Sequence, residues 1–267
     1  AWLEREDVVA RIWANDHTVW REDPTEIADR LGWLHVTREL AAQVPNLTMF
    51  ANRIKDSFFN RIVLLGMGGS SLGPEVIRQV VGSSAHYPIL TVLDSTSPSA
   101  VRTVTRSIDP ARTLFIVSSK SGGTIEPNTL YRYFRALVEA KVGEQEAGGH
   151  FIAITDPGTS LEMLAESEKF RSVYQNRTDI GGRYSVLSHF GIVPAALMGV
   201  DIGRLLARAE EMAGRPPGAI SLEGDSGAWL GAYIGTAAKE GRDKLTLIAS
   251  PKVASFGLWV EQLLAES

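Results

Sequence analysis

Glycine and hydroxyl residues follow two strand-like segments of this chain, at the point where each segment ends. The motif GMGGSS at 66–71 follows the apolar run at 61–65, and SSKSGGT at 118–124 follows the run at 113–117. Each loop leads into a segment with helical features, where free backbone N–H groups and the positive end of the helix dipole meet. Hydroxyls add further hydrogen-bond donors without adding charge. The two loops therefore predict an anion site that suits phosphate.

A third motif, DIGGRYS at 179–185, indicates chemistry on the bound anion. Arg183 carries a permanent positive charge, and Gly181 and Gly182 would let the backbone approach a ligand. Such a charge can stabilise the oxygen anion that forms when a proton moves between neighbouring carbons. The plain alternative is a surface or helix-capping arginine.

Two nucleotide-binding readings of the first loop fail at single positions. The dinucleotide fingerprint G-x-G-x-x-G needs glycine or alanine where Ser71 stands. A P-loop needs Lys-Ser or Lys-Thr after its last glycine, but Pro74 and Glu75 follow Gly73. A tight turn between strand and helix remains as the structural alternative for the first loop. For the second loop the alternative is a helix N-cap, although capping needs only one of its hydroxyl residues.

Short β-branched runs alternate with helical stretches from Arg61 onward, and this alternation predicts the elements that must position the loops. The predicted strands are 62–65, 89–93, 114–117, 151–154 and 245–248, with a weaker one at 171–174. Strands that are apolar throughout indicate a parallel sheet buried on both faces. We predict a three-layer α/β/α sandwich of flavodoxin-like type, whose ligands gather at the carboxyl ends of the strands.

The segment 1–57 is expected to be helical and to pack on the α/β domain of residues 58–267. Asp23-Pro24-Thr25-Glu26 has an N-cap residue, a proline at the first helical position and an acidic residue in the first turn, which predicts a helix start. The motif GRPPG at 214–218 is the clearest break in the pattern.

Composition narrows the function classes. The net charge of −4 disfavours nucleic acid as a partner, and no apolar stretch reaches the length of a membrane helix. The chain opens without a signal-peptide pattern, so a cytoplasmic location is the expectation. It has no cysteine, which removes disulfides, thiol nucleophiles and thiolate metal sites. Its five histidines show no pair at metal-ligand spacing, which predicts structural or surface roles for them.

The three motifs, in this order, resemble the sugar-isomerase domain of glucose-6-phosphate isomerases. The final residues 259–267 (WVEQLLAES) are similar to the start of the motif that carries the catalytic base of that family. The resemblance covers roughly the whole chain and is nearest to the isomerase half of bifunctional transaldolase/glucose-6-phosphate isomerases. The sequence departs from the family pattern at Gly123, where the family usually has threonine. The family chain also continues past this point, so we expect a fragment that is inactive alone.

The resemblance implies interconversion of glucose 6-phosphate and fructose 6-phosphate through an enediol, without metal or organic cofactor. It implies Glu266 as the base and Arg183 as the group that stabilises the enediolate. The substrate-binding residues that it implies are Gly69, Ser70, Ser119, Lys120, Ser121, Thr124, Gly182 and Gln262. A homodimer is implied for the full-length enzyme.

Two other functions stay open. Sugar-isomerase domains also serve as phosphosugar sensors without catalysis, but a sensor would lack Arg183 and Glu266 in their motifs. A nucleotide-binding oxidoreductase is disfavoured by Ser71, and measured NAD binding would revive it.

Overall fold

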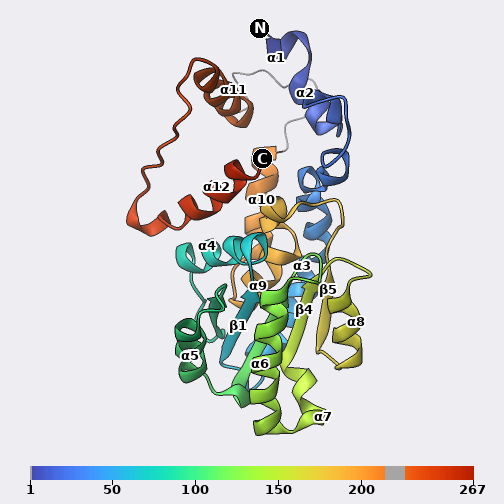
Figure 1. Ribbon diagram of the computed structural model, residues 1–267, viewed down its shortest axis with the longest axis vertical. Helices are drawn as coiled ribbons and strands as arrows, with labels where there is room; N and C mark the ends of the chain where they lie inside the picture. The colour runs from blue at the N-terminus through green and yellow to red at the C-terminus, as the bar shows by residue number, and fades with distance from the viewer. Residues whose placement is uncertain (1, 214–225) are drawn as a thin grey trace.

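Five parallel strands form the centre of the computed structural model, which describes residues 2–213 and 226–267. The strands lie in the order β2-β1-β3-β4-β5 (Figure 1). Their bounds are β1 (Arg61–Gly66), β2 (Ile89–Leu93), β3 (Thr113–Ser118), β4 (Phe151–Thr155) and β5 (Ser172–Gln175). The predicted α/β sandwich is confirmed, and the strand order is that of flavodoxin-like folds.

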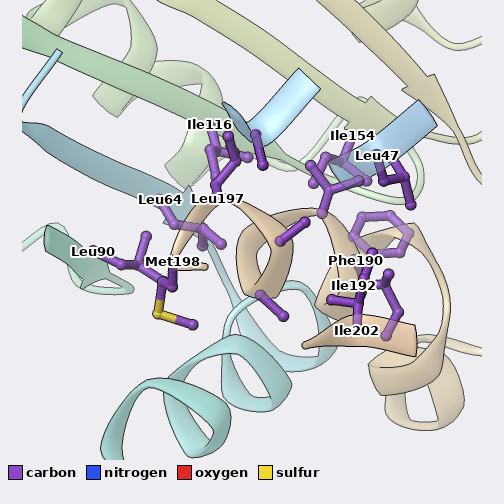
Figure 2. Packing of buried hydrophobic residues seen from close by; sticks show 14 of the residues in the cluster. Leu47, Leu64, Leu90, Ile116, Ile154, Phe190, Ile192, Leu197, Met198 and Ile202 are labelled. Carbon is purple, nitrogen blue, oxygen red and sulfur yellow. The ribbon is translucent and has the colours of Figure 1, made fainter. Parts of the chain in front are cut away.

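Alternate residues of each strand point to opposite faces of the sheet and build two cores. Ile62, Leu64 and Ile116 belong to the core that α3 (Val36–Lys55), α9 (His189–Leu197) and α10 (Ile202–Ala213) cover. Figure 2 shows this core, with Leu197 and Met198 beside Leu64. Val63, Leu65 and Phe115 belong to the second core, under α5 (Pro98–Ser107), α6 (Ile125–Val142) and α8 (Ser160–Ser167). Burial of both faces explains why the three central strands, β1, β3 and β4, are largely apolar.

Helix α9 is the most deeply placed of these elements. Each of its residues from His189 to Leu197 is buried, as expected of a helix that is apolar on all sides. It packs against α3 and against α4 (Leu72–Val80), and it follows directly on the turn that carries the third motif.

The N-terminal part consists of short helices and turns before α3. They are α1 (Trp2–Arg5), α2 (Val8–Trp13) and three 3₁₀ turns, His17–Val19, Ala28–Arg30 and Gly32–Leu34. The predicted helix start at Asp23 is wrong. Asp23 does accept a hydrogen bond from the Thr25 amide, but Glu26 has a left-handed backbone with φ of 62°, which ends the turn.

The C-terminal part contains α11 (Ser226–Lys239) and α12 (Phe256–Ala265). The predicted strand at 245–248 is wrong, because Leu245, Leu247 and Ile248 are exposed in a connection without regular structure. A strand needs a neighbour for its ladder of hydrogen bonds. Figure 1 shows this connection, in orange-red, away from the sheet. The break predicted at 214–218 lies outside the described residues.

The remaining elements are short. They are α7 (Glu144–Ala147) and the 3₁₀ turns η4 (Gly68–Ser70), η5 (Pro110–Arg112), η6 (Gly148–His150), η7 (Gly182–Leu187) and η8 (Pro251–Val253). The division of the chain at residue 57 stays a prediction. In residues 2–213 and 226–267, no helix combines the length and the apolar composition needed to cross a membrane.

Candidate active site

The first two loops meet at the carboxyl edge of the sheet because their strands are neighbours. Gly66, the last residue of β1, pairs in register with Ser118, the last residue of β3. The Ser118 hydroxyl donates a hydrogen bond of 3.1 Å to the backbone carbonyl of Ser70. The turn η4 is thereby fixed beside the start of the second loop.

The third motif packs directly on the first. The Ser185 hydroxyl lies 2.6 Å from the carbonyl oxygen of Gly182 and 3.3 Å from that of Gly69. A Cβ atom on Gly69 would lie 2.1 Å from the carbonyl oxygen of Gly182, so only glycine fits there. A Cβ on Gly182 would meet nothing within 4 Å, which leaves open space at that residue.

Helix α12 brings its predicted site residues to the same place from the far end of the sequence. Nε2 of Gln262 lies 3.0 Å from the position of a Cβ on Gly68, whose φ of 54° is left-handed. The same amide donates a hydrogen bond of 3.1 Å to Oε1 of Glu266. Glu266 is exposed and follows α12 as its C-cap. The pair at i and i+4 therefore shares one face of the helix beside the first loop.

Arg183 reaches the end of the same helix. Its Nε donates a hydrogen bond of 2.9 Å to the hydroxyl of Ser267, the residue next to Glu266. The guanidinium also lies 4.9 Å from the ring centre of Tyr184, whose hydroxyl is 2.7 Å from the Ser267 hydroxyl. Tyr184 stacks on Trp33 with ring centres 5.2 Å apart. An N-terminal aromatic residue thus supports the turn that holds Arg183.

The hydroxyls of the second loop face one another. Oγ of Ser119 lies 2.9 Å from Oγ1 of Thr124, and Oγ of Ser121 lies 3.5 Å from the same atom. Thr124 is the N-cap residue of α6, yet its side chain makes no capping hydrogen bond. The geometry therefore weakens the reading of this loop as an N-cap. Gly123 is exposed, and a side chain there would meet nothing within 4 Å.

The side-chain ammonium of Lys120 is held by two partners outside the second loop. Its Nζ pairs with Oδ2 of Asp156 and donates a hydrogen bond of 3.0 Å to the carbonyl of Thr178. Burial raises the pKa of Asp156, while the ammonium of Lys120 acts in the opposite direction. A direct contact between this ammonium and phosphate is not what the geometry favours.

A metal-binding group is not found in the described ranges, where no three His, Cys, Asp or Glu side chains lie together. Both ring nitrogens of the buried His189 have protein partners, the carbonyl of Gln175 at 2.7 Å and Oε1 of Gln43 at 2.9 Å. His189 is therefore a structural residue, as predicted for it.

Residue patterns did not single out the supports of the site, namely Asp156, Tyr184, Trp33 and Ser267. Asp156 had a usable signal, since it follows the apolar run 151–155 as the other loops follow theirs. The roles of Tyr184 and Ser267 depend on a contact between η7 and α12 across more than eighty residues of sequence. Local patterns carry no information on such a contact.

The chain is an α/β protein with a flavodoxin-like sheet, and its three glycine- and hydroxyl-rich loops lie beyond the carboxyl ends of the strands, where open α/β sheets place their ligands. The model of the family "Phosphoglucose isomerase" matches residues 51–215. The chain belongs to this family.

Curated relatives agree with the family. A glucose-6-phosphate isomerase of Synechococcus sp. (strain JA-2-3B'a(2-13)) is 36% identical over 220 residues, which cover 78% of this chain and 40% of the relative. One of Citrifermentans bemidjiense is 32% identical over 216 residues, with the same shares. The chain thus spans about 40% of the length of these relatives.

Two solved structures share the fold. A hypothetical protein of Thermus thermophilus has a TM-score of 0.82 and 25% identity, covering 98% of this chain and 59% of that one. A glucose-6-phosphate isomerase of Chlamydia trachomatis has a TM-score of 0.74 and 21% identity, covering 97% and 54%. At 21% identity, the similarity to the Chlamydia trachomatis structure concerns the fold alone.

Proposed function

We propose that these residues are part of an enzyme that interconverts glucose 6-phosphate and fructose 6-phosphate. The observation that carries the proposal is the convergence of η4, η7 and α12, which places Arg183 beside the helix end that carries Glu266. The family and its curated relatives support the same reaction. Their greater length supports a longer chain as the active protein.

In the proposed reaction, Glu266 takes the proton from C2 of the open-chain aldose and returns it to C1. The electron pair left at C2 forms the C1=C2 double bond of the enediol, and the carbonyl electron pair moves onto O1. The O2 hydroxyl then gives its proton to O1, so the negative charge passes to O2 until C1 takes up its proton and O2 becomes the ketone oxygen. Arg183 stabilises that charge without changing its own protonation state. Gln262 donates to the Glu266 carboxylate and so orients it, as the hydrogen bond in the structure supports.

The phosphate is proposed to bind between the second loop and the first. Ser119, Ser121 and Thr124 would donate hydroxyl hydrogen bonds, and Ser70 would add another from the first loop. The N-terminus of α6 contributes its backbone N–H groups and dipole. Gly182 would allow the backbone to approach the sugar, since the space beside it is open, while Gly69 allows the first loop to pack against the Gly182 carbonyl. Lys120 would contribute its backbone N–H to the phosphate.

The test uses the longer protein with Glu266→Gln, which keeps the shape of the side chain and removes the base. Exchange of the C2 hydrogen of glucose 6-phosphate in heavy water should fall by roughly 10²- to 10⁴-fold. Phosphosugar affinity should survive, because the phosphate contacts lie on other loops. Glu261→Gln is the matched control, since Glu261 is an exposed glutamate on the same helix.

Undiminished exchange in Glu266→Gln would assign the base to another residue. If the unchanged longer protein bound phosphosugar and caused no exchange at all, the sensor function would replace the enzyme. Arg183 and Glu266 at one site support the enzyme over the sensor.

Four further proposals follow from the resemblance and the composition. They are a homodimer, a cytoplasmic location, the absence of a nucleic-acid partner and the link to transaldolase fusions.

A further inference from the structure

The Lys120–Asp156 pair joins three segments that the sequence keeps apart. Lys120 lies in the second loop, Asp156 follows β4, and Thr178 directly precedes the third motif. The backbone strengthens one of these joins, because the Asp156 amide donates a hydrogen bond of 3.1 Å to the Lys120 carbonyl. The second of the two Nζ contacts joins the second loop to the carbonyl of Thr178, the residue before the motif that contains Arg183.

The pair is largely buried, so forming it carries a desolvation cost. The side chain of Asp156 is 12% exposed and that of Lys120 is 23% exposed. Charges that leave water lose hydration, so a buried pair often adds little net stability. A surface residue of the same loop could bind phosphate without that cost. The placement is better explained by a positioning role than by stability.

We propose that Lys120 is a positioning residue, with Asp156 as its fixed counter-charge, that sets the distance between the phosphate loop and the Arg183 turn. The inference rests on the proposed function and adds a residue, Asp156, to its machinery. It assigns the ammonium to the protein scaffold and leaves only the backbone N–H of Lys120 for the ligand. The substrate phosphate and the developing enediolate charge would then be held at a separation that this contact fixes.

The test compares Lys120→Met, Asp156→Asn and the double variant in the longer protein. Each single variant leaves one buried charge without its partner and should lower stability, whereas the double variant removes both charges and should recover much of it. The contact with Thr178 is absent from Lys120→Met and from the double variant. In both of these kcat should fall by roughly 10- to 100-fold, as is usual when a supporting contact is lost.

Affinity for inorganic phosphate separates this role from a direct contact. It should stay close to that of the unchanged protein in all three variants, because the hydroxyls of the second loop remain. If the ammonium were a phosphate ligand, Lys120→Met would lose phosphate affinity and Asp156→Asn would keep or gain it. That result would overturn the proposal.

Two further readouts complete the design. Amide hydrogen exchange at residues 178–185 should be faster in Lys120→Met and in the double variant, and this measurement needs no activity. If the double variant regained both stability and kcat, the pair would be structural only and the proposal would fail. Glu211→Gln, which breaks the exposed pair with Arg208, is the control that should change none of these quantities. If the unchanged protein lacked isomerase activity, the proposed function would fail while the exchange result would still decide on the contact.

Discussion

Gly69 and Gly182 touch through their backbones, so that a Cβ atom on Gly69 would lie 2.1 Å from the carbonyl oxygen of Gly182. The contact is one-sided, because a Cβ on Gly182 would point into open space. The two glycines of one contact therefore differ: Gly69 makes room for the Gly182 carbonyl, whereas we propose that the open space at Gly182 makes room for ligand.

The first prediction uses this difference. Gly69→Ala must push η4 and η7 apart, and it should destabilise the protein by about 1 to 3 kcal/mol, the usual cost of overpacking. Gly182→Ala should leave stability within about 0.5 kcal/mol and should weaken phosphosugar binding instead. Urea unfolding and calorimetric titration with 6-phosphogluconate measure the two effects. Equal loss of stability in both variants would contradict the assignment.

The second prediction concerns the hydroxyls of the phosphate loop. Ser119→Ala combined with Thr124→Ala should lower the affinity for inorganic phosphate by about ten- to a hundredfold per hydroxyl lost, since hydrogen bonds to charged groups are worth about 1.5 to 3 kcal/mol. Thr129→Ala is the control on the same helix, because its hydroxyl is already bonded to the Ile125 carbonyl. Unchanged affinity in the double variant would place the phosphate elsewhere.

The third prediction concerns pH and His189. Burial lowers the pKa of His189 in the folded protein, so the unfolded chain binds its proton first as the pH falls. Stability should therefore be fully present above the unfolded pKa of about 6.5 and should be lost as the pH falls below it, down to the folded pKa. His189→Gln should flatten this part of the curve of unfolding free energy against pH.

His86→Gln is the control for that measurement, because His86 is exposed. Some slope should remain in His189→Gln, since burial also lowers the pKa of His150. A slope that His189→Gln leaves unchanged would show that His189 does not carry the effect.

The fourth prediction concerns the chain by itself. The 267 residues should isomerise glucose 6-phosphate poorly or not at all, because they span about 40% of the length of the curated relatives. Binding of phosphate should nevertheless be measurable, since the proposed hydroxyl donors of the second loop and the start of α6 lie within these residues. Full turnover in a coupled assay of this chain would refute the expectation.

The central strands β1, β3 and β4 could be predicted from sequence because burial on both faces makes each a largely apolar run, whereas the edge strand β5 is less buried and gave a weaker signal. The run at 245–248 has a similar composition and forms no strand. An apolar composition indicates that a segment can be buried, but it does not show whether a neighbouring strand is available to pair with it. The helix start predicted at Asp23 to Glu26 is also wrong. Its capping residues are suitable, but the backbone of Glu26 is left-handed, so no helix continues from it. The three loops could be located because each follows a strand, whereas Lys120's partners, Asp156 and Thr178, could not be inferred without the packing.

The path of the chain through this site also sets an order of assembly. The phosphate loop lies between β3 and α6 and needs only neighbouring strands, so a growing chain could complete it once β4 has been made. The Arg183 turn and α12 must be brought back across long stretches of sequence, and such contacts are slow to form. A domain emerging from the ribosome would thus complete the second loop before the Arg183 turn and α12 pack beside the first loop.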